Sequence, residues 1–252
     1  MPQPSTVEQH YEALLGSHYT WMMGGLERCL ADARQLVERT GIARPPLTAP
    51  VLDLGCGPGY HARTLAERGC RVIAVDLSET CLRELRELCS GLDVVPVHAD
   101  LLDAGAYEQH GPFAAVVCVG DTLTHLEIRD QVLRLLELAQ RLLAPDGALV
   151  VEFREQPGEL IAADAVLPLR AERDRIMQCV LHFERDRVRV TDVLYEWTGD
   201  AWKCTKSSYT KLRLTSGEIV REAEARGLRL AWSETRAGRR VLLLRKGGTP
   251  GA

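Results

Sequence analysis

The stretch Val51-Leu52-Asp53-Leu54-Gly55-Cys56-Gly57-Pro58-Gly59-Tyr60 decides the fold of this chain. Its apolar first half runs directly into three glycines at alternate positions, and a helical pattern of apolar residues follows. This order predicts a buried strand, a tight turn and the N-terminus of a helix. Glycine is needed where the backbone turns sharply or where a ligand approaches closer than a Cβ atom allows. The stretch therefore predicts a ligand-binding turn at the end of a strand.

The same order of strand and helix continues along the next hundred residues. Near-continuous apolar strands separated by helices indicate a parallel sheet that is covered on both faces. Pro96 in the third strand indicates a position at the sheet edge, and Ser78 is expected to cap the second helix. The expected strands are 51–54, 71–76, 94–98, 113–119 and 147–153, and the expected helices are 59–68, 79–90 and 128–143.

The flanking segments follow other patterns. Residues 5–40 are expected to form two helices with a break at Gly16-Ser17, and a proline-rich linker follows at 44–50. After residue 154 the alternation predicts an antiparallel sheet of about three strands. A helix that begins after Thr215 and ends at Gly227 precedes two last strands, expected at 228–235 and 239–245.

Composition excludes several classes of protein. The 252 residues carry a net charge of −4, whereas proteins that bind nucleic acid usually present a basic face. No apolar run reaches the roughly 18 residues of a transmembrane helix, and no signal peptide is visible. The eight cysteines form no C-x-x-C pair, and the histidines show no spacing typical of metal ligands. We expect a cytoplasmic protein with reduced thiols and no metal, nucleic-acid or membrane partner.

Three aspartates lie at the expected ends of successive strands. Asp53 is near the end of the first strand, Asp76 ends the second, and Asp100 follows the third. Ligands of an open parallel sheet bind at the carboxyl ends of its strands. A carboxylate that ends the second strand can accept hydrogen bonds from two ribose hydroxyls. Together these positions predict a nucleoside site.

The glycine spacing indicates which nucleoside ligand is bound. A dinucleotide fingerprint has the spacing G-x-G-x-x-G, which rests a pyrophosphate on the helix N-terminus. Here the pattern is G-x-G-x-G, and Asp53 precedes it. An acid so close to the turn disfavours a pyrophosphate and suits a cationic amino-acid group. A nicotinamide-dependent oxidoreductase, which would bind a dinucleotide, is therefore less well supported than an enzyme whose nucleoside ligand carries a cationic amino-acid group.

These motifs resemble those of class I S-adenosylmethionine-dependent methyltransferases. Residues 51–59 are similar to the first motif of that family, Asp76 to its ribose-binding acid, and 99–101 to its adenine-contacting motif. Residues 113–125 resemble the fourth motif, and 142–147 the turn before the fifth strand. The sequence around 119–126 is most similar to the branch of small-molecule enzymes that includes the glycine and sarcosine N-methyltransferases. That branch carries asparagine and serine where Asp121 and Thr122 stand here.

The resemblance implies an α/β fold. Its core would be a Rossmann-like, mostly parallel sheet of seven strands in the order 3-2-1-4-5-7-6. Residues 1–48 would form an N-terminal helical lid, and 49–246 the methyltransferase domain. Within that domain, 160–213 would be an antiparallel insertion that covers the substrate. Monomer and homodimer both remain open.

The resemblance also names S-adenosylmethionine as the cofactor and assigns candidate residues. Those for the cofactor are Tyr11, Tyr19, Trp21, Met22, Asp53, Gly55, Cys56, Gly57, Gly59, Asp76, Leu77, Asp100, Leu101, Val119, Gly120 and His125. Catalytic candidates near the strand ends are Asp121, His125 and Arg154. Candidates for the substrate wall are Tyr195, Trp197, Tyr209 and Arg213, although aromatic residues of a small sheet are more often part of a core. His125 can be a base, a cap or a cofactor contact, and Arg154 a carboxylate clamp or a surface ion pair.

The expected reaction is an in-line transfer of a methyl group to a small molecule, preferentially to an amine nitrogen. Proximity and alignment in a dry pocket can supply most of the catalysis, without a covalent nucleophile. Two alternatives remain. The acceptor can be the oxygen or sulfur of a small metabolite, or the chain can catalyse another reaction of the same cofactor, such as its cyclisation.

Overall fold

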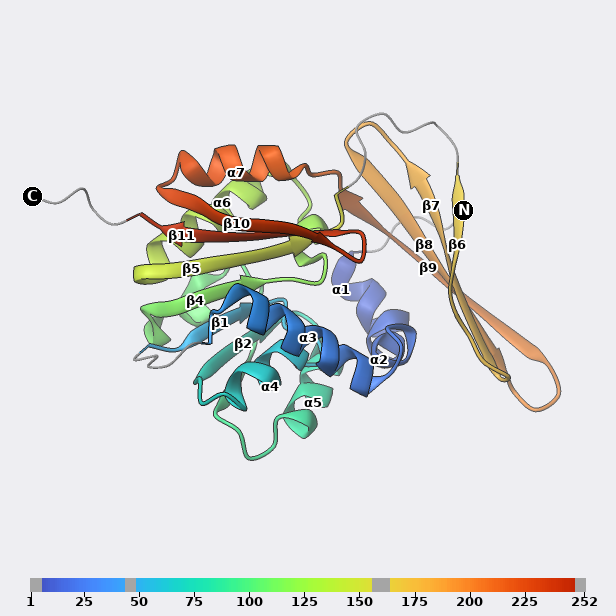
Figure 1. The fold of residues 1–252 in the computed structure, drawn as a ribbon. Helices are drawn as coiled ribbons and strands as arrows, with labels where there is room; N and C mark the ends of the chain where they lie inside the picture. The colour runs from blue at the N-terminus through green and yellow to red at the C-terminus, as the bar shows by residue number, and fades with distance from the viewer. Residues whose placement is uncertain (1–5, 44–48, 156–163, 248–252) are drawn as a thin grey trace, which may run out of the picture.

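The computed structural model describes residues 6–43, 49–155 and 164–247. A seven-stranded sheet with helices on both faces forms the larger part, and a four-stranded antiparallel sheet stands beside it (Figure 1). A helical segment at the N-terminus lies between the two parts (Figure 1). In the described part of the chain, no helix has both the length and the apolar character that a membrane span requires.

The large sheet has the predicted strand order. Strands β1 to β5 run parallel, while β11 pairs antiparallel with both β5 and β10, which gives β10-β11-β5-β4-β1-β2-β3. Counting the last two strands as six and seven, this is the order 3-2-1-4-5-7-6. Pro96 lies in the edge strand β3, as its missing N–H predicts. The strands are β1 (Val51–Leu54), β2 (Val72–Asp76), β3 (Val94–His98), β4 (Phe113–Cys118), β5 (Leu143–Phe153), β10 (Leu228–Arg236) and β11 (Arg239–Lys246).

Alternating side chains of the strands bury two separate cores. Leu52 and Leu54 pack with α6 (Arg129–Leu142) and α7 (Ser216–Glu224) on one face. Val51 packs on the other face with α3 (Leu26–Thr40), α4 (Tyr60–Ala66) and α5 (Glu79–Leu88). The predicted caps are present, because the hydroxyls of Ser78 and Thr215 accept hydrogen bonds from backbone N–H groups of α5 and α7. Two short 3-10 turns, η3 (Ala104–Ala106) and η4 (Glu108–His110), lie between β3 and β4, and a third, η5 (Thr122–His125), follows the carboxyl end of β4.

The prediction of a helix break at Gly16-Ser17 was wrong. Helical backbone continues through Gly16, and the break comes at Gly24 and Gly25, whose φ angles are +106° and +94°. The pattern misled because glycine at φ −55° fits a helix, whereas a positive φ ends one. The segment comprises α1 (Val7–His10), the π-helical turn η1 (Tyr11–Leu15), the 3-10 turn η2 (Gly16–His18) and α2 (Tyr19–Met22). Below it is called the lid.

The antiparallel insertion has four strands rather than about three. They are β6 (Ala165–Ala171), β7 (Arg175–Phe183), β8 (Arg187–Trp197) and β9 (Trp202–Leu212), and together they are called the cover sheet. Strand β6 was missed because Pro168 interrupts its pattern. It tolerates this proline because β6 is an edge strand with a register shift between Pro168 and Arg170. Residues 160–163 of the predicted insertion lie outside the described residues.

Candidate functional site

A cavity of about 380 Å³ lies where the carboxyl ends of β1, β2 and β4 meet the lid. Its size is within the range of small-molecule sites, roughly 300–1,000 Å³. The sheet, the lid and the end of β9 all contribute side chains, so residues distant in sequence share one space. The residues that line it are Thr6, Val7, Glu8, Tyr11, Tyr19, Gly55, Cys56, Gly57, Pro58, Tyr60, His61, Asp76, Leu77, Ser78, Ala99, Asp100, Leu101, Leu102, Val119, Gly120, Thr122, His125, Leu126, Glu127, Gln131 and Thr210.

The three glycines of the turn have different surroundings. All have positive φ angles, which favours glycine at each position. A Cβ atom on Gly55 would lie 2.3 Å from Cγ2 of Thr122, and one on Gly59 would lie 2.7 Å from Cγ of Leu85. At Gly57 nothing lies within 4 Å of that position. Gly57 is thus the glycine that keeps backbone accessible to a ligand, while Gly55 and Gly59 permit close packing.

Asp76 ends β2 at the cavity, held by two backbone donors. Gly57 N donates to its Oδ2 at 2.7 Å and Ser78 N to its Oδ1 at 2.8 Å. Burial raises the pKa of Asp76, and the N–H groups of Ser78 and Gly57 oppose that rise. The next strand end is similarly ordered, because Leu102 N donates to Oδ1 of Asp100 at 2.7 Å. Both predicted strand-end carboxylates therefore face the same cavity.

Asp53 does not line the cavity. Its side chain is only 1% exposed, on the face of β1 that α4 covers. Burial, with the nearby charge of Asp76, raises the pKa of Asp53 to about 7. The structure thus keeps this carboxyl beneath the glycine turn, away from the space where we expected it to meet a cationic group.

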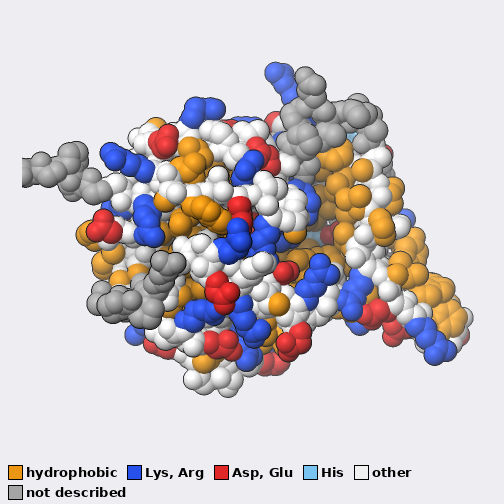
Figure 2. Space-filling model, viewed as in Figure 1, with side chains coloured by type: hydrophobic (Ala, Val, Ile, Leu, Met, Phe, Trp, Pro, Cys, Tyr) orange, Lys and Arg blue, Asp and Glu red, His pale blue; other side chains and the backbone are white. Residues whose placement is uncertain are grey.

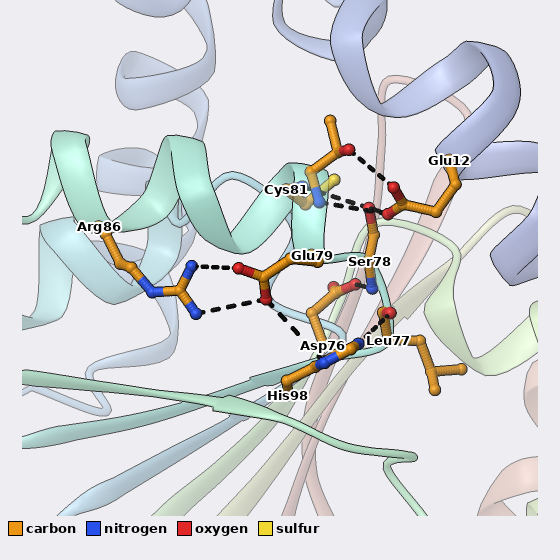
Figure 3. Close-up of polar contacts among 9 residues, drawn as sticks. Glu12, Asp76, Leu77, Ser78, Glu79, Cys81, Arg86 and His98 are labelled. Atoms are coloured by element: carbon orange, nitrogen blue, oxygen red, sulfur yellow. Dashed lines mark hydrogen bonds and ion pairs between the residues drawn. The ribbon is translucent and has the colours of Figure 1, made fainter.

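The lid is fastened directly above Asp76. The Glu12 carboxylate accepts hydrogen bonds from the hydroxyls of Ser78 and Thr80, at 2.6 and 2.8 Å, and from Thr80 N at 3.2 Å (Figure 3). Tyr11, the residue before Glu12, lines the cavity. The start of α5 therefore positions both the strand-end acid and the lid.

Of the four lid residues assigned to the cofactor, two reach the cavity. Tyr11 and Tyr19 line it, with ring centroids 6.1 Å apart, and burial raises the pKa of both phenols. Trp21 and Met22 instead pack against the cover sheet. The guanidinium of Arg175 lies 4.6 Å from the Trp21 ring centroid, so Trp21 holds the lid to that sheet.

His125 lies in the cavity between aromatic rings. Its ring centroid is 5.9 Å from that of Tyr11 and 5.5 Å from that of Tyr209, both edge-on. Burial, and after it the charge of Lys211, lowers the pKa of His125 to about 3. Its Nε2 is buried with no hydrogen-bond partner. The cavity is therefore lined in part by a neutral imidazole, whose Nε2 is buried and has no hydrogen-bond partner.

Asp121 and Arg154 lie behind the cavity wall. Arg154 N donates to Oδ1 of Asp121 at 2.5 Å, and Lys211 Nζ lies 3.1 Å from its Oδ2. Burial would raise the pKa of Asp121, but the charges of Lys211 and Arg239 and this N–H hold it below its usual value. The Arg154 side chain is exposed and lies near Gly238. Both residues therefore join strands rather than contact the cavity.

The four expected wall residues of the insertion are dispersed. Tyr209 is buried behind His125. Trp197 is exposed and pairs with Trp202 at the far end of β8 and β9 (Figure 1). Tyr195 lies on the same face as Trp197, and Arg213 donates to the carbonyls of Glu184 and Arg185. Only Tyr209 is close to the site.

A buried polar group that the sequence did not indicate joins the lid to the cover sheet. His10 Nδ1 lies 2.8 Å from Ser207 Oγ, and its Nε2 lies 3.0 Å from Oδ2 of Asp192. The partners are almost two hundred residues apart, so no local spacing could have found them. Lys211 and Thr122, beside Asp121 and Gly55, were missed for the same reason.

Residues 51–147 match the family described as "Methyltransferase domain". These residues form a methyltransferase domain. The matched segment spans the glycine turn, Asp76, Asp100 and His125, so the methyltransferase domain supplies the floor of the cavity.

Relatives of the domain use different acceptor atoms. The dTDP-3-amino-3,6-dideoxy-alpha-D-glucopyranose N,N-dimethyltransferase of Streptomyces fradiae is 33% identical over 122 residues, which cover 48% of this chain and 44% of that protein. The ubiquinone biosynthesis O-methyltransferase of Xylella fastidiosa (strain 9a5c) is 35% identical over 114 residues, 43% of each chain. The chain thus spans less than half the length of these two relatives.

A solved structure matches the whole architecture, lid and cover sheet included. It is the S-adenosylmethionine-bound CalS10 of Micromonospora echinaspora, an amino pentose methyltransferase involved in calicheamicin biosynthesis. The TM-score is 0.73 at 22% identity, with 97% of this chain and 100% of that chain covered. The fold of the methyltransferase domain with its two additions is therefore one that other methyltransferases share.

Proposed function

We propose that this protein transfers a methyl group from S-adenosylmethionine to an amine nitrogen of a small molecule. The observation that carries the proposal is the cavity itself. The open face of Gly57, the carboxylate of Asp76 and the side chain of His125 all belong to the lining of one cavity. Such a space suits a cofactor at one end and an acceptor at the other.

The residues present fit this cofactor. Asp76 would accept the ribose hydroxyls, and Asp100 with Leu101 would border the adenine. The backbone at Gly57 would let the amino-acid part approach, as an added Cβ would not. When bound, S-adenosylmethionine supplies a methyl group made electrophilic by its sulfonium.

The charges of the cavity favour a cationic or neutral ligand. Glu8, Asp76, Asp100 and Glu127 are among its lining residues, whereas the described lining includes no lysine or arginine. Opposite charges attract in a poorly solvated space, and like charges repel. The arrangement thus supports a sulfonium and an amine, and it disfavours an acceptor that places a carboxylate or phosphate inside.

The side chains around His125 would align the acceptor and exclude water. A neutral His125 in its Nδ1–H tautomer can accept a hydrogen bond from an acceptor N–H at Nε2. The rings of Tyr11 and Tyr19 would close the space around the reacting atoms, with Tyr209 supporting His125 from behind, so that proximity and orientation lower the barrier. With a pKa of about 3, His125 is too weak a base to take a proton efficiently at neutral pH. The amine would therefore react as the free base.

The absence of a base among these candidates favours nitrogen over oxygen. A hydroxyl acceptor must lose its proton as it attacks, whereas the free base of an amine has a lone pair available. Asp121, the other candidate, already pairs with Lys211 and Arg154 N. One relative methylates oxygen by its name, so this choice needs a direct test.

The test is product analysis with the purified chain. S-adenosylmethionine is incubated with a panel of small primary amines and the matching alcohols, and the products are measured by mass spectrometry. We expect S-adenosylhomocysteine and an N-methylated amine in equal amounts. Methylation of the alcohols alone would contradict nitrogen as the acceptor, and methylthioadenosine without S-adenosylhomocysteine would contradict methyl transfer.

A further inference from the structure

The cover sheet presents apolar side chains on both of its faces. On the inner face, Met177 and Leu194 are buried against Leu14 and Leu15 of the lid. Residues directly opposite in neighbouring strands share a face, so the pairing of Ile176 with Tyr195 places both on the outer face. The apolar members of the outer face are Val166, Ile176, Val180, Val193, Tyr195, Trp197 and Trp202.

Several of these side chains are strongly exposed. The exposed fractions are 59% for Val166, 44% for Trp197, 44% for Trp202 and 38% for Ile176. Hydrophobic side chains also gather visibly over this sheet (Figure 2). An antiparallel sheet with one face in water normally alternates apolar and polar side chains. Contiguous exposed apolar surface of this kind marks an interaction site.

We propose that the outer face of the cover sheet binds the same face of a second copy of this chain, forming a dimer about a two-fold axis. In a two-fold interface each subunit presents the same patch, so an apolar face finds its complement in the other copy. Two sheets can pack face to face at about 10 Å with interdigitating side chains. Tryptophan and tyrosine, present here, are enriched in such interfaces.

The area of the outer face can be compared with the area that a dimer interface needs. The strands β6, β7, β8 and β9 have 7, 9, 11 and 11 residues, so at about 3.4 Å per residue and about 4.8 Å between strands the face covers roughly 600 Å². A standard stable interface buries about 800 Å² on each partner. The face alone therefore approaches the area that a stable dimer needs.

The charges of the outer face also favour an apolar protein partner. Across its middle rows only Lys206 carries a charge. In the next row of the outer face, His182 forms an ion pair with Asp164, and Arg189 forms one with Glu184. A membrane-binding face would be rimmed by unpaired lysine and arginine, whereas these basic groups are paired with acids. A face with a single charge in its middle rows matches another such face.

The edge of the cover sheet indicates contact through the face rather than through strand pairing. Pro168 in the edge strand β6 has no N–H to donate, and the register shifts between Pro168 and Arg170. Proline and bulges at an edge prevent another strand from adding to it. The β6 edge is therefore unsuited to strand pairing, and the proposed contact uses the side chains of the outer face.

Sedimentation velocity of the full chain at micromolar concentration tests the proposal. The expected mass of the wild type is twice 27.9 kDa. The double variant Ile176→Lys, Trp202→Lys is expected to be monomeric, because lysine at both positions places charge in the contact. Leu230→Lys, at a 39% exposed leucine of β10, is the matched control and stays dimeric. Far-UV circular dichroism confirms that each variant is folded.

Cys204 gives a second readout on the same face. It pairs with Tyr195 across the strands and is the exposed one of the eight cysteines. In a dimer its reaction with a maleimide is slowed at least severalfold relative to the folded double variant. A monomeric wild type, a folded double variant that stays dimeric, or binding to anionic lipid vesicles by a monomeric wild type would overturn the proposal. None of these outcomes depends on methyl transfer.

Discussion

Gly57 and Gly59 stand two residues apart in one turn but have separate roles, which gives a matched pair of variants. Gly57→Ala points a methyl group into open space, so we expect a free energy of unfolding lower by only about 1 kcal/mol, from its positive φ. The affinity for S-adenosylhomocysteine should fall at least about tenfold, or about 1.4 kcal/mol. Calorimetry and urea unfolding measure the two quantities.

Gly59→Ala is expected to do the reverse. Its new Cβ would lie 2.7 Å from Cγ of Leu85, so overpacking adds to backbone strain and unfolding should become easier by about 2–3 kcal/mol. The folded fraction should bind S-adenosylhomocysteine as the wild type does. If Gly57→Ala leaves the affinity intact, the cofactor does not approach that glycine.

His125 allows the orienting role to be separated from that of a base. Its low pKa keeps the imidazole neutral through the neutral pH range, so the rate should rise with pH as the acceptor amine loses its proton. His125→Gln retains a hydrogen-bond acceptor and should preserve the shape of the pH profile. His125→Ala should lower kcat about tenfold, which corresponds to one hydrogen bond of about 1.4 kcal/mol. A limb of the pH–rate profile that disappears in His125→Gln would instead identify a base.

At the scale of elements, the site depends on how the lid is held to the cover sheet. His10 and Asp192 are both buried, and Ser207 occupies the other ring nitrogen. Asp192→Ala leaves Nε2 of the buried His10 without a hydrogen-bond partner and should lower the free energy of unfolding by about 3 kcal/mol. Ser207→Ala removes one neutral hydrogen bond and should cost about 1 kcal/mol. Urea unfolding measures both, and equal costs would show that the His10–Asp192 contact is not the dominant one.

The sequence predicted the elements of the large sheet well and those around it less well. The strands β1 to β5 are apolar runs separated by helices, and this is the pattern expected of strands that are buried in a parallel sheet. Gly16 led to the prediction of a helix break, but its φ angle is helical and the backbone continues. Pro168 hid strand β6, which tolerates a proline because it lies at the edge of its sheet. Local patterns cannot show such context.

At the scale of the whole molecule, the nucleoside half of the site could be predicted and the acceptor half could not. Asp76 and Asp100 follow strands whose order the pattern already implies, so their meeting at one edge was predictable. The surroundings of His125 combine the lid, β4 and β9, and these approach one another only through tertiary packing. Trp197 and Arg213, assigned to the wall by residue type alone, lie elsewhere for this reason.

Calorimetric titration of the purified chain with S-adenosylhomocysteine tests the central claim most directly. We expect saturable heat with one site per chain for the wild type and for the control Asp93→Ala, which changes an exposed carboxylate at the opposite end of the sheet. Asp76→Asn should weaken binding at least about tenfold, because a charged acceptor for the ribose hydroxyls is lost. Folded wild-type protein that gives no binding heat, or equal affinity in Asp76→Asn, would contradict the account.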